Sequence, residues 1–146
     1  MLFSMRKENI MSFYPIIEIE GIGEIYKSKL NEVGIKDTRD YLERSKTPIE
    51  REKLSKETGI PEKLILEWAN LSDLMRIDGV AEEYADLMEE AGVDTVKELK
   101  NRVPENLYEK MKEINEMKNL VRRLPSLNDV KSWVEQAKEL PPMLEY

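Results

Sequence analysis

The apolar residues of this chain recur at steps of three and four positions, which is the spacing of a helix with one buried face. Leu64, Trp68, Leu71 and Met75 form the clearest run of this kind. The strict alternation of apolar and polar residues that indicates a β-strand is missing from the sequence. The pattern therefore predicts an all-α fold.

Glycine, proline and threonine mark the ends and starts of these helices. Gly34 and Gly92 each follow a periodic apolar run, and glycine adopts the left-handed conformation after a helix without a steric clash. Thr47-Pro48, with Glu50 behind it, combines an N-cap, a proline in the first turn and a capping glutamate. These signals predict short helices joined by tight turns.

Two stretches of the chain are similar to each other. Residues 17–42 align with residues 75–99 when one residue is inserted near Asp37, so that Gly21 matches Gly79. The same alignment makes further pairs: Ile22 with Val80, Tyr26 with Tyr84, Gly34 with Gly92, and Leu42 with Leu99. A duplication of this kind predicts one structural unit used twice.

A third, degenerate unit is expected at the C-terminus. Residues 74–76 are similar to residues 120–122, and an amphipathic helix over residues 127–137 would follow. Pro125 stands where the first two units have their glycine. The match therefore covers less of the unit than the first alignment does.

The order of a short helix, a Gly-x-Gly turn, a second helix and a glycine cap resembles the helix-hairpin-helix fold. Two such units, together with the stretches KLSKETGI, ILEWANLSDLMRI and NLVRRLPS, resemble the tandem helix-hairpin-helix family catalogued as a domain of unknown function, number 4332. The likeness spans residues 12–141. It implies two tandem units in a SAM-like helical bundle and leaves the activity open.

The resemblance also divides the chain. It suggests Met11 as the natural start, so that residues 1–10 are an N-terminal extension with a disordered tip. Residues 11–72 are expected to form the first unit. Residues 73–146 are expected to form the second unit with the C-terminal helices, and the two units to pack as one compact body.

Composition narrows the possible chemistry. The chain has no cysteine and no histidine, which excludes disulfides, zinc sites of the Cys/His type and imidazole catalysis. Its carboxylates are not paired in a recognisable catalytic loop, so we expect no enzyme activity, no cofactor and no metal site. The apolar runs are too short to cross a membrane. We expect a cytoplasmic protein that makes no membrane contact.

Charge is unevenly distributed along the chain. Residues 1–72 carry 12 basic and 13 acidic side chains, whereas residues 73–146 carry 11 and 17, which gives a net charge of −7. Five of the acidic residues fall within residues 81–90, just after the second glycine turn. A basic footprint for nucleic acid over the whole molecule is therefore absent.

Resemblance to DNA-binding hairpins points to the first glycine turn as a site for a phosphate. In those hairpins the free amides at the start of the second helix meet the phosphate, aided by the helix dipole. Here that role would fall on the amides of Gly21, Ile22 and Gly23, with Lys27 and Lys29 adding charge. The implied partner is the backbone of DNA or RNA, bound weakly and without sequence preference. The plainer interpretation is a tight corner with Ile22 buried and both lysines solvated, which the short motif by itself favours.

In two respects the chain departs from DNA-binding hairpins. The basic residue usual two positions after the second glycine is Ile25 in the first unit and Glu83 in the second. The second unit also has Ala81 in place of its second glycine. We expect no phosphate site there, because acidic side chains repel phosphate. The alternative function is a protein-interaction or scaffold module whose hairpins are purely structural; the sequence leaves the oligomeric state open.

Overall fold

The computed structural model describes residues 13–146, and these residues form eight α-helices and one short 3₁₀-helix. The predicted all-α class is confirmed. In chain order the elements are η1 (Ile16–Glu18), α2 (Glu24–Glu32), α3 (Thr38–Arg44), α4 (Pro48–Thr58), α5 (Glu62–Leu74), α6 (Ala81–Glu90), α7 (Val96–Leu99), α8 (Pro104–Lys118) and α9 (Leu127–Glu139).

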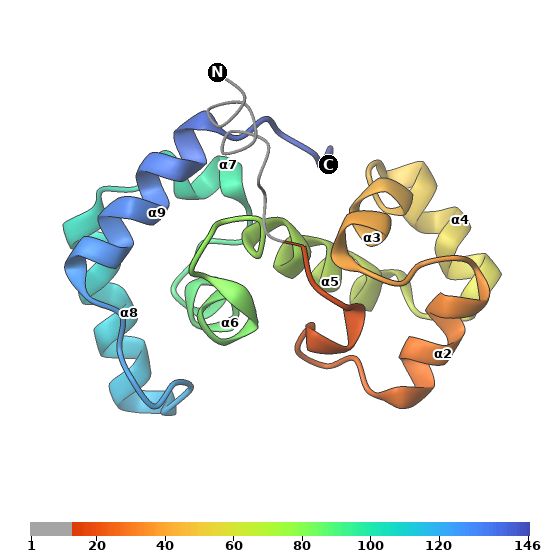
Figure 1. Cartoon of the computed structure of the whole chain (residues 1–146), viewed down its shortest axis with the longest axis horizontal. Coiled ribbons are helices and arrows are strands. Elements are labelled where there is room, and N and C mark those ends of the chain that lie inside the picture. Colours follow the sequence, from red (N-terminus) through yellow and green to blue (C-terminus); the bar gives the residue numbers. More distant parts are fainter. Residues whose placement is uncertain (1–12) are drawn as a thin grey trace, which may run out of the picture.

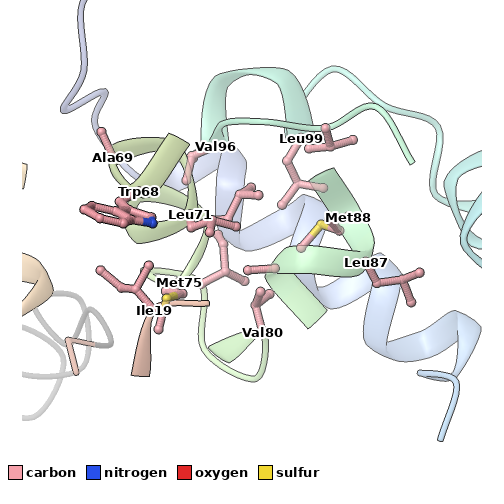
Figure 2. Close-up of a cluster of buried hydrophobic side chains, with 14 of the residues drawn as sticks. Ile19, Trp68, Ala69, Leu71, Met75, Val80, Leu87, Met88, Val96 and Leu99 are labelled. Carbon is pink, nitrogen blue, oxygen red and sulfur yellow. The ribbon is translucent and has the colours of Figure 1, made fainter. Parts of the chain in front are cut away.

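Helix α5 lies at the centre of the molecule (Figure 1). Helices α2, α3 and α4 lie on one side of it, and α6 to α9 lie on the other. Helix α5 packs against α3, α4 and α6, while α9 packs against α7 and α8. One cluster of buried apolar side chains includes residues of both halves, and it extends from Ile19 and Trp68 to Leu87 and Leu99 (Figure 2).

Most helix boundaries follow from local chemistry. The hydroxyl oxygens of Thr47 and Thr95 each accept a hydrogen bond from the amide three residues later, and Ser126 forms a complete capping box with Asp129. Helix α4 ends at Gly59, whose φ of 78° lies in the left-handed region. The predicted N-cap at Thr47 is confirmed.

The two glycine bends have the same backbone and the same neighbour. The φ angle is +95° at both Gly21 and Gly79. A Cβ atom built on Gly21 would lie 3.2 Å from Nε1 of Trp68, and one built on Gly79 would lie 3.1 Å from Nε1 of Trp133. Helix α9 therefore holds in the second half the position that α5 holds in the first.

A tyrosine completes each of these contacts. Tyr26 meets the ring of Trp68 edge-on, with the ring centres 5.0 Å apart. Tyr84 lies at a tilt against Trp133, at 5.4 Å. Aromatic pairs of this geometry stabilise a core beyond their buried area. Tyr26 and Tyr84, which match in the sequence alignment, thus make equivalent contacts in the two halves of the structure.

Where the degenerate third unit is expected, the structure has α8, a loop over residues 119–126, and α9 packed against α8. Residues 119–126 make no helix before α9. Helix α8 ends at Asn119 in the left-handed conformation, and Pro125 cannot take the positive φ of the glycine bends because its ring fixes φ near −65°. The helix predicted over residues 127–137 exists as α9, but it completes the second half.

The expected border between residues 72 and 73 falls inside α5. This helix closes the first half through Trp68, and its C-terminal end leads directly into the second glycine bend. The N-terminal extension expected at residues 1–10 lies outside the described residues.

Candidate nucleic-acid interface at the first glycine bend

The first glycine bend, residues 19–23, leads the chain from η1 into α2. The amide of Ile22 donates to the carbonyl of Ile19 at 3.1 Å, and the positive φ of Gly21 completes the turn. The side chain of Ile22 is buried. One hydrogen bond, one glycine and one apolar anchor therefore fix the direction in which α2 starts.

Gly23 is the N-cap residue of α2, and the space around it is open. A Cβ atom built on Gly23 would have no atom within 4 Å, and no side chain of the described residues caps the helix. The first amides of an α-helix have no partner within the helix and carry part of the positive end of its dipole. The start of α2 therefore presents N–H groups to solvent.

The amides expected to bind phosphate were those of Gly21, Ile22 and Gly23. The amide of Ile22 is engaged inside the turn by the carbonyl of Ile19, and this residue serves as an apolar anchor. Of the three predicted amides, that of Ile22 is therefore taken up inside the turn, which leaves those of Gly21 and Gly23 together with the first turn of α2. Glu24, in that turn, places a carboxylate near them.

The two candidate lysines lie on different sides of α2. Two residues along an α-helix correspond to a rotation of about 200°, so Lys27 and Lys29 point in nearly opposite directions. Lys27 is partly buried, whereas Lys29 is exposed next to Ile25, one turn earlier. Neither lysine forms an ion pair with a residue that the structure describes.

Lys27 lies in a hollow of about 400 Å³ along one face of α2. The other residues that line it are Glu24, Ser28, Asn31 and Glu32. Two carboxylates therefore accompany the single cation, so this face is not basic overall. The spacing of two residues already indicates that Lys27 and Lys29 lie on different sides of a helix.

The second glycine bend has the same hydrogen bond but is held more firmly. The amide of Val80 donates to the carbonyl of Ile77 at 3.1 Å. In addition, the side chain of Gln136 in α9 accepts from the amide of Asp78 at 2.9 Å and donates to its carbonyl at 3.2 Å. The side chain of Gln136 thus satisfies both backbone polar groups of Asp78, the residue just before Gly79.

Carboxylates from several elements gather beside α6, and we name them the acidic cluster: Glu67, Asp86, Glu89, Glu90 and Asp94. Burial, together with the negative charges of Glu67 and Asp94, raises the pKa of Glu89 to about 7. Burial also raises the pKa of Asp86, with Glu20 as the next cause. A phosphate that approached this side of the molecule would be repelled.

The sequence located only part of the acidic cluster. Asp86, Glu89 and Glu90 share one helix and are among the five acidic residues that the sequence shows within residues 81–90. Glu67 comes from α5 and Asp94 from the loop after α6, and only the fold brings them close, so no local signal could have found them. Lys118 of α8 forms an ion pair with Glu90 at the edge of the cluster.

Within residues 13–146, no three acidic, histidine or cysteine side chains converge in a way that could hold a metal ion. In the same part of the chain, none of the helices has the length and apolar character needed to cross a bilayer.

Comparison with known proteins identifies one family. A search of the curated proteins and a search of the solved structures each found no match. A family model described as a domain of unknown function (DUF4332) matches residues 20–140. This range includes Gly21, Gly79 and every helix from α2 to α9. The chain therefore belongs to the DUF4332 family, as the motifs of its sequence predicted.

Proposed function

We propose that this chain is a non-catalytic binding module and that it binds a nucleic-acid backbone through the first glycine bend. The observation that carries this proposal is the open start of α2, where Gly23 leaves the first amides of the helix uncapped. Phosphate oxygens accept hydrogen bonds from such amides, and the helix dipole favours their negative charge. Lys27 and Lys29 flank the site from two sides and add positive charge.

We further propose that the two halves are tandem helix-hairpin-helix units. The support is the matched backbone: both bends have a glycine at φ +95°, and the helix after each one is followed by a second left-handed glycine, Gly34 at 87° and Gly92 at 96°. In this proposal only the first unit binds a ligand. The second unit has a structural role only, because Glu83 is exposed at the start of its helix and its negative charge would repel a phosphate.

A site that contacts two or three phosphates binds weakly. The logarithm of the binding constant should fall with the logarithm of the salt concentration with a slope of about −2 to −3. Binding should also be similar for DNA and RNA of different sequence, since phosphate contacts carry no base information. We propose the cytoplasm as the place where this contact is made.

Fluorescence anisotropy with a labelled duplex at low salt tests the proposal. The double variant Lys27→Glu/Lys29→Glu should lose most of the binding. Lys110→Glu/Lys112→Glu is the matched control, because it makes the same charge change at the same spacing on α8. Equal losses in both variants would mean that only net charge matters, and an unbound wild-type chain at low salt would end the proposal.

Protein recognition is the second candidate, and one observation favours it specifically. Ile25 is 73% exposed at the position where DNA-binding hairpins carry a basic residue. A large exposed apolar side chain beside an open helix start suits a protein surface as well. In that case the hairpins are purely structural, and neutralising Glu83 and Asp86 or replacing Ile25 should remove a partner from a pulldown.

A further inference from the structure

The last six residues of the chain form an extended segment that returns to the first half of the molecule. We name residues 141–146 the tail (Figure 1). It follows the end of α9 with two prolines, which stiffen the chain. The amide of Glu145 donates to the carbonyl of Lys46 at 2.8 Å, and Leu144 is partly buried against the apolar core.

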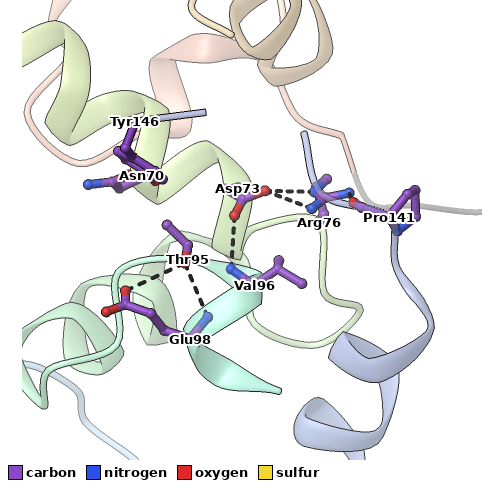
Figure 3. A network of polar contacts seen from close by, with 8 residues as sticks. All are labelled: Asn70, Asp73, Arg76, Thr95, Val96, Glu98, Pro141 and Tyr146. Carbon is purple, nitrogen blue, oxygen red and sulfur yellow. Dashed lines mark hydrogen bonds and ion pairs between the residues drawn. The ribbon is translucent and has the colours of Figure 1, made fainter. Parts of the chain in front are cut away.

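Two buried arginines hold the backbone of the tail. Nη1 of Arg76 donates to the carbonyl of Pro141 at 2.8 Å (Figure 3), and Nη2 of Arg51 donates to the carbonyl of Glu145 at 2.8 Å. Arg76 is 1% exposed and Arg51 is 6% exposed. The carbonyls that they bind lie four residues apart, about 13 Å in an extended chain.

The two arginines differ in their other partners. Arg76 forms an ion pair with Asp73 at 2.7 Å, and Asp73 also accepts from the amide of Val96 at 2.8 Å (Figure 3). Arg51 has no carboxylate partner among residues 13–146; its second hydrogen bond goes to the carbonyl of Ser45 at 2.7 Å. A buried cation needs such acceptors, so Arg51 depends on a carbonyl from the tail.

Toward residues 13–146, Tyr146 is the one residue of the tail whose side chain makes a directed polar contact. The hydroxyl of Tyr146 donates to Oδ1 of Asn70 at 2.5 Å, and its ring lies 5.6 Å from the guanidinium carbon of Arg51. Tyr146 as a whole nevertheless remains 65% exposed. It forms one wall of a hollow of about 410 Å³, whose other walls come from α5, α7 and the residues that flank α7.

The tail is thus held mainly through groups that any extended peptide possesses. Its three backbone hydrogen bonds, at Pro141 and Glu145, would be available to another chain in the same conformation. The tail is also attached to the molecule, so its effective concentration is on the order of millimolar. A separate peptide must therefore displace the tail before it can bind.

We propose that the surface that holds the tail, through Lys46, Arg51, Asn70 and Arg76, is a peptide-binding site that the chain's own tail occupies as an internal competitor. Its ligand is an extended segment of a partner protein with the chemistry of the tail: two carbonyls four residues apart and an aromatic residue directly after the second. This site is separate from the first glycine bend and does not depend on nucleic-acid binding.

The full-length variant Leu144→Asp tests this site, because a charged side chain at a partly buried position should release the tail. The probe is the fluorescent peptide PPMLEY, identical to residues 141–146, followed by anisotropy. We expect the variant to bind the peptide at least tenfold more tightly than the wild-type chain does. Replacing Arg51 by Met in the same background should abolish the gain.

Tyr146→Ala is a second way to loosen the tail, and it serves if Leu144→Asp loses helical content by circular dichroism. It should also raise peptide affinity above that of wild type. The proposal is overturned if folded, tail-released chains bind no peptide. It is overturned equally if the Arg51→Met change leaves the gained affinity intact.

Discussion

At Gly21 the chain turns against Trp68, and at Gly79 it turns against Trp133, with the same φ of +95° and nearly the same distance to the indole nitrogen. The surroundings of the two bends differ. The first opens onto an uncapped helix start, whereas the second is clamped by Gln136 and lies beside the acidic cluster. The two bends thus share their backbone and their packing, whereas the charge and the capping around them differ.

The largest expected effects concern the two tryptophans. Trp68→Ala and Trp133→Ala should each lower the free energy of unfolding by about 3–5 kcal/mol, since both rings are buried and leave cavities. Urea denaturation followed by circular dichroism measures the loss. If Trp133→Ala lowered the free energy of unfolding by less than about 1 kcal/mol, the two halves would not be equivalent, because α9 would then not stabilise the second half as α5 stabilises the first.

The bend glycines come next. Gly21→Ala and Gly79→Ala should each cost about 1–3 kcal/mol, because alanine is strained at φ +95° and its Cβ would press on an indole nitrogen. Gly23→Ala is the matched control: its φ is −98° and the space around it is open. It should cost less than about 1 kcal/mol. Similar losses at all three glycines would show that the bends are not the strained positions.

The free energy of unfolding, measured over a range of pH, should show a contribution from the second half of the molecule, where Glu89 lies. The pKa of Glu89 is about 7 in the folded chain and 4.5 when unperturbed, so the folded state binds more protons than the unfolded state between these values. The free energy of unfolding should therefore fall as pH rises from 4.5 to 7. Because the side chain is partly exposed, we expect a contribution on the order of 1 kcal/mol.

Two variants isolate the source of this pH dependence. Glu89→Gln removes the titrating group, so the curve of unfolding free energy against pH should become flatter. The variant should also be more stable than wild type at pH 8. Glu24→Gln, on the helix after the first bend, is the corresponding change in the other half and should leave the wild-type slope in place. An unchanged slope in Glu89→Gln would refute the assignment.

The smallest expected effect is a gain of binding at the first bend. Ile25→Lys supplies the basic residue that DNA-binding hairpins have at this position, and should tighten duplex binding a few-fold while making the salt slope steeper by about 1. Ile49→Lys is the control, since Ile49 on α4 is 70% exposed, like Ile25 at 73%. Equal gains from both substitutions would remove the distinction between the bend and the rest of the surface.

The features that the sequence predicted correctly depend on residues within a few positions of each other. The all-helical class, the cap at Thr47 and the glycine at each bend all express local backbone preferences. The equivalent positions of Tyr26 and Tyr84 could also be predicted, because the two copies of a duplicated unit place matching residues at the same sites. Family membership followed from the same motifs.

The features that the sequence missed depend on contacts between distant elements. The contact of Trp133 with Gly79, which brings α9 onto the second glycine bend, has no local signal in the sequence. Glu67 joins the acidic cluster only because α5 packs against α6. The binding of the tail by Arg51 spans 94 positions and has no local pattern at all.

The most direct test of the account is a titration of the ¹⁵N-labelled chain with a short duplex at low salt, followed by amide chemical shifts. We predict that the amides of residues 23–26 shift in a saturable manner while those of residues 81–84 stay in place. Stationary amides at residues 23–26, or equal shifts at both bends, would contradict the proposal that the first glycine bend alone binds a phosphate backbone.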